Sequence, residues 1–280
     1  MILNDNIPIE VAYETIVTKM RNFFHATGMK KAVLGLSGGI DSAVVMAIAC
    51  EALGKENVHG LLMPSQFSTL HSVSDAVDLS NNLGIKYTIV PIEKIYNRFM
   101  RELFSFFEIG KWSVAQENLQ ARIRGTILMT YSNRFDALLL NTSNKSELFV
   151  GYGTLYGDLC GAMMVIADLY KLQVYEIAGY INSSLGNVIP ASTIQKTPSA
   201  ELRPGQKDSD SLPPYDVLDP IIYALHEEGK SAEEVIAEGA DRVIVERIIS
   251  LNRTYSFKLA QIPPVITVTD KPVAPNYKCI

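Results

Sequence analysis

Residues 33–44 read Val-Leu-Gly-Leu-Ser-Gly-Gly-Ile-Asp-Ser-Ala-Val. The apolar run Val33–Leu36 predicts a short buried strand, and Ile40–Leu53 is apolar enough on all sides to predict a buried helix. The Ser37–Gly39 tripeptide between them predicts a tight turn that lets the backbone approach a ligand closely. Because such a turn gathers backbone N–H groups at the positive end of the helix dipole, it predicts an anion site, above all for phosphate.

The same stretch carries a carboxylate, Asp41, in the first turn of the predicted helix. There it could hold Mg²⁺ against the phosphates that it faces, because Mg²⁺ prefers a few carboxylates together with phosphate oxygens. The loop lacks the Gly-x-x-x-x-Gly-Lys-Ser/Thr pattern of a Walker loop. An ordinary strand–turn–helix with a serine cap is the alternative. It fits a lone Ser-Gly-Gly better than it fits Ser-Gly-Gly-Ile-Asp-Ser behind an apolar strand.

The composition is that of a soluble globular protein, which we expect to form one domain over residues 1–280. With 48% hydrophobic and 20% charged residues, the chain can bury a substantial core. A net charge of −5 without a long basic run argues against a nucleic-acid partner. No apolar stretch reaches the roughly 20 residues that a membrane span requires. We expect no signal peptide, because no basic region precedes an apolar core at the N-terminus. The widely spaced Cys50, Cys160 and Cys279 suggest a reducing, cytoplasmic compartment and no zinc site.

Predicted strands and helices alternate along the first half of the chain. The predicted strands are Ala32–Leu36, Val58–Met63, Lys86–Val90 and Ala137–Asn141. The predicted helices are Ile9–Ala26, Ile40–Leu53, His71–Leu83, Ile92–Phe107 and Ala115–Asn133. This alternation predicts an α/β fold with a parallel, Rossmann-like doubly wound sheet flanked by helices. Ligands would then bind beyond the carboxyl ends of the strands, where the Ser37 loop lies.

The second half is predicted to be helical. Its helices are Lys171–Ser183, Tyr215–Gly229, Ser231–Glu238 and Asp241–Leu259. Ser231, followed three residues later by Glu234, predicts a capping box. The segment Thr197–Pro214 holds few large apolar residues, so we expect a long mobile loop. The tail from about residue 262 to 280 is predicted to be extended.

The Ser37 loop resembles the pyrophosphatase loop of the N-type ATP pyrophosphatases. These enzymes split ATP between its α and β phosphates and leave AMP on a substrate oxygen. The family includes NAD synthetase, GMP synthetase, asparagine synthetase, argininosuccinate synthetase and tRNA thiolases. The loop alone implies the class of reaction and leaves the substrate open.

Three further segments resemble NAD synthetase rather than its relatives. The first is Glu117-Asn-Leu-Gln-Ala-Arg-Ile-Arg124, in which helical spacing puts Leu119, Ile123 and Ile127 on one apolar face. The second is Leu139-Leu-Asn-Thr-Ser-Asn-Lys-Ser-Glu147, a strand that runs into a polar loop. The third is Gly153-Thr-Leu-Tyr-Gly-Asp158, followed by the segment 197–219 with its Pro-Ser-Ala-Glu-Leu-Arg-Pro run. The resemblance covers about residues 10 to 270.

The resemblance implies a role for each matching residue. It implies that Asp41 and Glu147 hold Mg²⁺, that Lys171 is catalytic and binds ATP phosphates, and that catalytic Asp158 lies where ammonia enters. Deamido-NAD (nicotinic acid adenine dinucleotide) would contact Arg122, Arg124, Asp158 and Lys258. ATP would contact Gly35, Leu36, Ser37, Gly38, Gly39, Ile40, Asp41, Ser42, Met63, Thr142, Lys171 and Ser199.

The chain departs from the pattern of the short, ammonia-dependent members. Leu155 stands where they have a lysine, and Leu159-Cys160 stands where they have two glycines. Phe257-Lys258-Leu259 replaces their His-Lys-Arg. At these positions the sequence resembles the synthetase half of the glutamine-dependent enzymes more closely. Those enzymes carry a glutaminase domain before the synthetase domain. Because the first predicted helix begins near Ile9, we expect no glutaminase, with ammonia from solution or from a separate chain.

The implied reaction is the last step of NAD biosynthesis. The nicotinate carboxylate attacks the α-phosphorus of ATP, pyrophosphate leaves, and ammonia displaces AMP from the adenylated intermediate. ATP is then a co-substrate, Mg²⁺ the cofactor, and the Ala115–Tyr131 helix the interface of a homodimer. The alternatives are another amide-forming pyrophosphatase such as a GMP synthetase fragment, a synthetase subunit fed by a separate glutaminase, and a non-catalytic nucleotide-binding subunit.

Overall fold

A computed structural model describes residues 7–107 and 112–274 of the chain. In the first half the elements are α1 (Ile9–Thr27), β1 (Lys31–Gly35), α2 (Ile40–Leu53), η1 (Lys55–Asn57), β2 (Val58–Leu62), α3 (Leu70–Leu83), β3 (Lys86–Ile89), α4 (Glu93–Phe107), α5 (Val114–Phe135) and β4 (Ala137–Asn141). In the second half they are α6 (Lys145–Phe149), β5 (Met163–Met164), α7 (Lys171–Leu185), α8 (Ala191–Gln195), η2 (Asp208–Asp210), α9 (Tyr215–His226), α10 (Ala232–Ala237), α11 (Arg242–Tyr255) and η3 (Ser256–Gln261).

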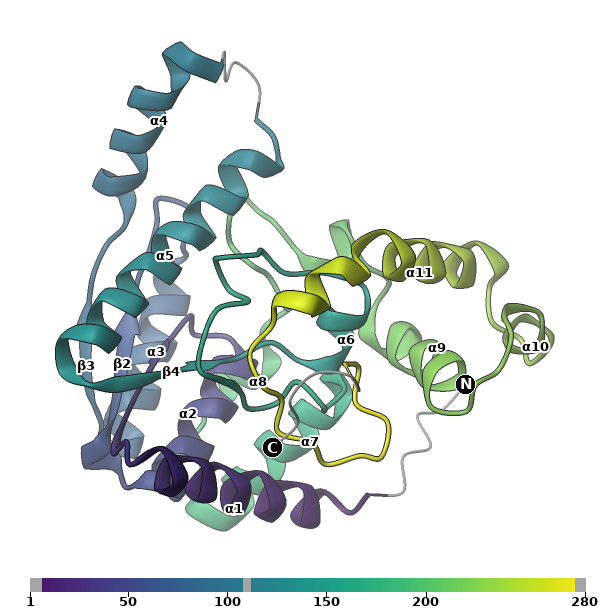
Figure 1. The fold of residues 1–280 in the computed structure, drawn as a ribbon, viewed down its shortest axis with the longest axis horizontal. Coiled ribbons are helices and arrows are strands. Elements are labelled where there is room, and N and C mark those ends of the chain that lie inside the picture. The colour runs from purple at the N-terminus through teal and green to yellow at the C-terminus, as the bar shows by residue number, and fades with distance from the viewer. Residues whose placement is uncertain (1–6, 108–111, 275–280) are drawn as a thin grey trace.

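Within the described residues, five parallel strands form one sheet in the order β3-β2-β1-β4-β5 (Figure 1). The predicted α/β fold with a parallel, doubly wound sheet is confirmed. The fifth strand was missed because it is only two residues long and pairs through Met163 and Met164 alone. β1 lies between β2 and β4, so the chain reverses its winding direction at β1 and β4. Ligands bind at such a reversal in open α/β sheets.

Helices cover both faces of the sheet, so its strands are buried on both sides. On β1, Ala32 and Leu34 pack into the cluster formed by α1, α2, α3 and α7, while Val33 packs into the cluster that holds Ile123 of α5. Figure 1 shows α4 and α5 on one side of the sheet and α1, α2 and α7 on the other. The predicted all-round burial of α2 is confirmed, because its residues from Ala43 to Ala49 are all buried.

The helical second half forms its own hydrophobic cluster. Leu218 and Ile222 of α9 pack there with Val245 and Ile248 of α11 and with Leu148 of α6. Figure 1 shows α9, α10 and α11 grouped beside the sheet. The capping box at the start of α10 is present, since Ser231 and Glu234 exchange hydrogen bonds. α6 belongs to this second cluster, and β4, which comes shortly before it in the chain, belongs to the sheet. Residues 142–144 between them therefore lie where the two hydrophobic cores meet.

Several boundaries differ from the prediction. The helix predicted over Asp241–Leu259 ends at Tyr255 and continues as the tighter η3. The chain is extended at Ile262, as the residue before a proline generally is. Beyond it Val265 forms an isolated bridge to Met164 of the edge strand β5. Residues 275–280, with Cys279, lie outside the described residues. In the parts of the chain that the structure describes, no helix is long and apolar enough to cross a membrane.

Candidate active site

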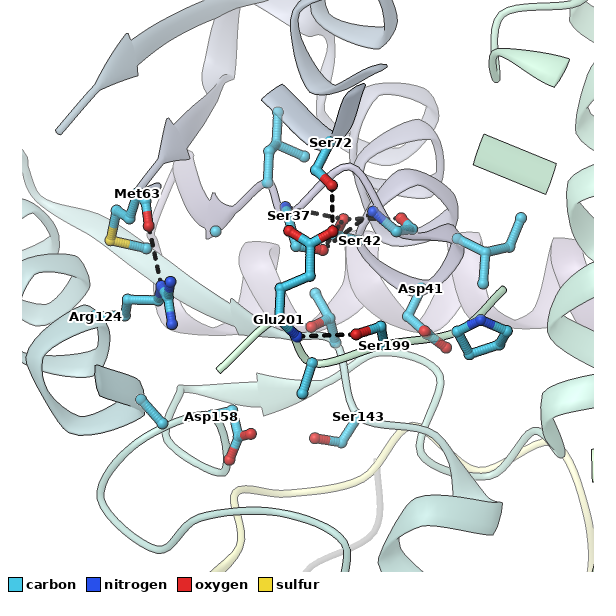
Figure 2. Close-up of a pocket in the computed structure, with 18 of the residues that line it drawn as sticks. Ser37, Asp41, Ser42, Met63, Ser72, Arg124, Ser143, Asp158, Ser199 and Glu201 are labelled. Atoms are coloured by element: carbon cyan, nitrogen blue, oxygen red, sulfur yellow. Dashed lines mark hydrogen bonds between the residues drawn. The ribbon is translucent and has the colours of Figure 1, made fainter. Parts of the chain in front are cut away.

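The turn after β1 is closed by its own serines. The Ser42 hydroxyl donates to the Gly39 carbonyl at 3.0 Å and accepts the Ser37 N–H at 3.3 Å, and the Ser37 hydroxyl accepts the Gly39 N–H at 3.2 Å. Figure 2 shows Ser37 and Ser42 together at the start of α2. The first N–H groups of a helix have no partner within it, so this closed turn presents donors to a ligand.

Gly38 fixes how closely this turn packs against α3. Its φ is +79°, and a Cβ on it would lie 2.1 Å from the backbone oxygen of Ser72. No other residue type fits there, because both the backbone conformation and the space exclude a side chain. Gly38 is therefore a packing residue, and it lies outside the cavity lining that the structure describes.

A lysine and two carboxylates meet beyond the ends of β1 and β4. The Lys171 ammonium forms an ion pair with Asp41 and lies 3.6 Å from Oε1 of Glu147. Asn144 joins the same group, because its side chain donates to Asp41 at 2.9 Å and accepts the Glu147 N–H at 3.0 Å as the N-cap of α6. The parallel pairing of β1 with β4 thus brings Asp41 and Glu147 to one edge of the sheet.

Burial and the mutual charges of the three side chains set the pKa values of this group. Burial and the neighbouring Asp41 carboxylate raise the pKa of Glu147 to about 8, against the opposing effect of Lys171. Burial lowers the pKa of Lys171, but the carboxylates of Asp41 and Glu147 outweigh it and raise that pKa overall. The lysine therefore stays charged, and its single positive charge does not fully compensate the two carboxylates.

Asp219, on α9, links α6 and α7. It is fully buried, accepts the Ser146 hydroxyl at 2.6 Å and accepts the Leu172 N–H in the first turn of α7 at 2.9 Å. The Ser146 hydroxyl in turn accepts the Lys171 N–H at 2.9 Å. Burial raises the pKa of Asp219 to about 6, although these hydrogen bonds oppose the rise. One carboxylate from the second core thus fixes α6 and α7.

Asp158 ends a separate loop on the other side of the cavity (Figure 2). Its carboxylate accepts the Thr154 N–H at 2.5 Å, and its carbonyl accepts the side chain of Asn141, the last residue of β4, at 2.6 Å. Burial raises the pKa of Asp158, while the Thr154 hydrogen bond and the Lys258 ammonium lower it. Asp158 is therefore a better proton acceptor than an exposed aspartate.

Most of the residues predicted from the sequence line one cavity of about 290 Å³. The predicted residues in its lining are Gly35, Leu36, Ser37, Gly39, Ile40, Asp41, Ser42, Met63, Arg124, Thr142, Glu147, Asp158, Lys171 and Ser199. Three predicted residues lie outside the described lining, namely Gly38, Arg122 and Lys258. The roles of all these residues toward ligands stay predictions.

The three basic residues predicted to contact the dinucleotide differ in their surroundings. Arg124 faces the cavity, donates from Nε to the Met63 carbonyl at 3.0 Å, and has its pKa lowered to about 10 by burial. Arg122 is exposed and donates to the Leu155 carbonyl at 3.2 Å. Lys258 donates to two carbonyls of the Asp158 loop at 2.7 Å each, so it braces that loop.

The segment 197–214 covers part of the cavity and is attached by polar contacts. Glu201 reaches α3, and Asp208 is buried and accepts the hydroxyls of Tyr152 at 3.1 Å and Tyr215 at 3.0 Å. Ser199 donates to the Gln206 carbonyl at 2.6 Å within the segment. The segment is thus held by hydrogen bonds where the sequence offered little apolar surface. Sequence reasoning missed Asn144 and Asp219, because their contacts join residues distant in the chain.

The donor set is suited to Mg²⁺ only together with a ligand. No group of three His, Cys, Asp or Glu side chains that could hold a metal ion occurs among the described residues. Asp41 and Glu147 nevertheless converge on one ammonium, and the raised pKa of Glu147 marks incompletely compensated negative charge. Two carboxylates completed by phosphate oxygens and water match the way proteins hold Mg²⁺.

Comparison with known proteins gives one consistent result. A family model described as NAD synthase matches residues 12–262. A glutamine-dependent NAD(+) synthetase of Synechocystis sp. is 48% identical over 265 residues, which are 95% of this chain and 47% of that protein. The chain thus spans about half the length of the curated relatives that it matches.

Two solved structures of similar length share the fold. An NH3-dependent NAD synthetase from Campylobacter jejuni aligns with a TM-score of 0.74 and 31% identity, over 93% of this chain and 100% of that one. An NMN synthetase from Francisella tularensis aligns with a TM-score of 0.78 and 26% identity, over 90% of this chain and 96% of that one.

Proposed function

The chain belongs to the NAD synthase family, and on that premise we propose that it catalyses the ATP-dependent amidation of deamido-NAD to NAD. The observation that carries the proposal is the convergence of four groups in one cavity: the Ser37 loop, the Asp41–Glu147 carboxylates, Lys171 and Asp158. Together they supply an anion site, charge neutralisation and a proton acceptor. The departing pyrophosphate and the incoming ammonia need these three functions.

In the first step the nicotinate carboxylate attacks the α-phosphorus of ATP and pyrophosphate leaves. The Ser37 loop would hold the departing phosphates with its N–H groups, and Lys171 would neutralise their charge. Asp41 and Glu147 would hold Mg²⁺, which supplies further charge neutralisation when bound. Arg124, with its guanidinium in the cavity, would bind a phosphate or carboxylate of the dinucleotide.

In the second step ammonia attacks the adenylated carboxyl carbon and AMP leaves. Asp158 would bind ammonium and accept its proton, a role that its raised pKa favours. Water has to be kept away from the adenylate, and the segment 197–214 over the cavity would act as a lid during this step.

We propose that the chain as given uses ammonia that is produced elsewhere. Curated relatives are named glutamine-dependent, and one structural neighbour is named NH3-dependent. The second step is the same whether the ammonia comes from glutamine or from solution. Glutamine hydrolysis needs an activated nucleophile, usually a cysteine. Burial raises the pKa of the Cys50 thiol to about 12 and also raises that of Cys160. Both thiols are therefore poor nucleophiles.

We also propose a homodimer that uses α5. This helix turns Ile123 inward and leaves Val114, Met129 and Phe135 exposed, and α4 beside it exposes Phe99. An exposed apolar surface of this kind favours association. Sedimentation at micromolar concentration should give twice the chain mass, and a stable, active monomer would refute the dimer.

The test of the function is the choice of substrate. Purified protein with ATP, Mg²⁺ and ammonium should convert deamido-NAD to NAD and release AMP and pyrophosphate in equal amounts. The likeness to an NMN synthetase makes nicotinate mononucleotide the second substrate to offer, and XMP serves as the control. If the protein prefers the mononucleotide, the proposed substrate changes to that compound. If neither deamido-NAD nor nicotinate mononucleotide causes the protein to release pyrophosphate from ATP, the proposed function is refuted.

A further inference from the structure

A second lysine, Lys196, lies close to the Ser37 loop and lines the same cavity. Lys196 directly follows α8, and its ammonium donates to the Ser72 hydroxyl and to the Glu201 carboxylate, the latter at 2.8 Å. Ser72 is the residue whose carbonyl lies against Gly38 of the loop. Lys196 and the phosphate-binding turn are therefore separated by a single residue, and both border the same cavity.

A carboxylate of the protein itself occupies the space between these donors. Glu201 accepts from the Ser72 hydroxyl at 2.5 Å and from the Thr69 hydroxyl and N–H at 3.2 Å each, besides Lys196. Figure 2 shows its side chain reaching from the lid segment toward Ser72. Hydrogen bonds from Lys196 and Ser72 lower the pKa of Glu201, although burial opposes this. The carboxylate is therefore held as an anion.

Thr193 supplies an independent sign of a missing ligand. It lies on α8 one helical turn before Lys196, it is 2% exposed, and it lines the cavity. Its hydroxyl has no hydrogen-bond partner among the described residues. A buried hydroxyl without a partner costs free energy, which an oxygen of a bound ligand would offset.

The charge balance of the cavity indicates what that ligand is. Among the described residues that line the cavity, the cations are Lys171, Lys196 and Arg124. Lys171 is already shared between Asp41 and Glu147, and Arg124 lies by Met63 and faces Asp158. A polyphosphate on the Ser37 loop needs positive charge beside it, and Lys196 lies next to the loop with only one carboxylate, Glu201, to balance it.

We propose that Lys196 and Thr193 form the second wall of the polyphosphate subsite, and that Glu201 is the internal anion that neutralises Lys196 until a phosphoryl group replaces it. The inference rests on the proposed function and names a part of its ATP site. Lys196 exchanges the Glu201 carboxylate for a phosphoryl oxygen, and the Thr193 hydroxyl donates to the same group. Glu201 keeps its bonds to Thr69 and Ser72, so the lid segment stays attached to α3.

The experiment is calorimetric binding of inorganic pyrophosphate, with Mg²⁺ present and no turnover. Lys196→Met should weaken binding by about 10- to 100-fold, as expected for the loss of a charge-assisted hydrogen bond. Lys196→Arg should recover part of that loss. Thr193→Val, which keeps the size of the side chain, should weaken binding by about 3- to 10-fold. Glu201→Gln should tighten binding several-fold, because a competing negative charge is removed.

Lys30→Met is the matched control, because Lys30 is an exposed lysine before β1 that lies outside the cavity lining and outside the lid segment. It should bind pyrophosphate like the unaltered protein. Thermal unfolding of each variant checks that it is folded. If the unaltered protein forms no NAD and binds no pyrophosphate, the proposed function fails. If it does both, and Lys196→Met binds pyrophosphate equally well, the subsite is wrong. Weaker binding by Glu201→Gln would refute its role as a placeholder.

Discussion

The pKa of Glu147 makes the stability of the ligand-free protein depend on pH. Its pKa rises from the ordinary 4.5 to about 8 in the folded state, because the side chain is buried next to Asp41. A raised carboxyl pKa means that folding favours the protonated form. The associated stability is fully present below pH 4.5 and is lost as the pH rises toward 8.

The size of the effect follows from the same numbers. One pH unit corresponds to about 1.4 kcal/mol, so a rise from 4.5 to about 8 corresponds to about 5 kcal/mol in total. The side chain is 16% exposed, so solvent screening removes part of this. Between pH 5.5 and 7.5 we expect the free energy of unfolding to fall by about 2 kcal/mol on account of Glu147.

The measurement compares the protein with Glu147→Gln in urea unfolding across that pH range, without divalent ions. Glutamine stays neutral, and its backbone N–H still donates to the Asn144 side chain. The difference in free energy of unfolding between the two proteins should therefore change by about 2 kcal/mol between pH 5.5 and 7.5. Glu14→Gln, at an exposed position on α1, is the control and should show no such shift. Adding Mg²⁺ at pH 7.5 should stabilise the unaltered protein and not Glu147→Gln. A difference that stays constant with pH would refute the burial argument.

Four further outcomes are expected. Asp158→Asn should lower NAD formation about 100-fold while ATP–pyrophosphate exchange continues, since only the second step needs this carboxylate. Gly38→Ala should lower stability by about 2 kcal/mol or more in urea unfolding, whereas Gly205→Ala, with a similar φ but open space around it, should cost about 1 kcal/mol. Asp219→Asn should lower kcat about ten-fold with little change in the KM for ATP, because it acts by positioning α6 and α7. Deletion of Gly205–Asp210 should lower the yield of NAD per AMP, and a ratio near one at an unchanged rate would show that the segment is no lid.

The sequence predicted the parts of the fold that depend on local pattern. Apolar runs such as Val58–Met63 and the all-round apolar helix Ile40–Leu53 gave strands and helices to within a few residues, because burial dictates their composition. β5, α6 and α8 were missed, since elements of two to five residues have no periodicity to detect. The predicted end of α11 was too late, because the six residues after Tyr255 continue as the tighter helix η3, which the sequence pattern does not distinguish from an α-helix.

The site was predictable only where its chemistry is local. The Ser37 loop could be inferred from its own residues, since strand, turn and helix follow one another directly. The meeting of Lys171 with Asp41 joins residues 130 apart, and only the resemblance to a family suggested it. Asp219 and Lys196 were beyond sequence reasoning, because each looks like an ordinary surface charge until α9 or α8 is placed.

The ion pair between Asp41 and Lys171 has a consequence for biosynthesis of the chain. The ribosome delivers the Ser37 turn and Asp41 more than a hundred residues before Lys171, and Asp219 follows later still. A nascent chain with β1 and α2 already formed has the turn and its carboxylate but no ammonium beside them. The cluster of Asp41, Lys171 and Glu147 is therefore complete only after the second core has folded, and the proposed nucleotide chemistry has to wait for that step.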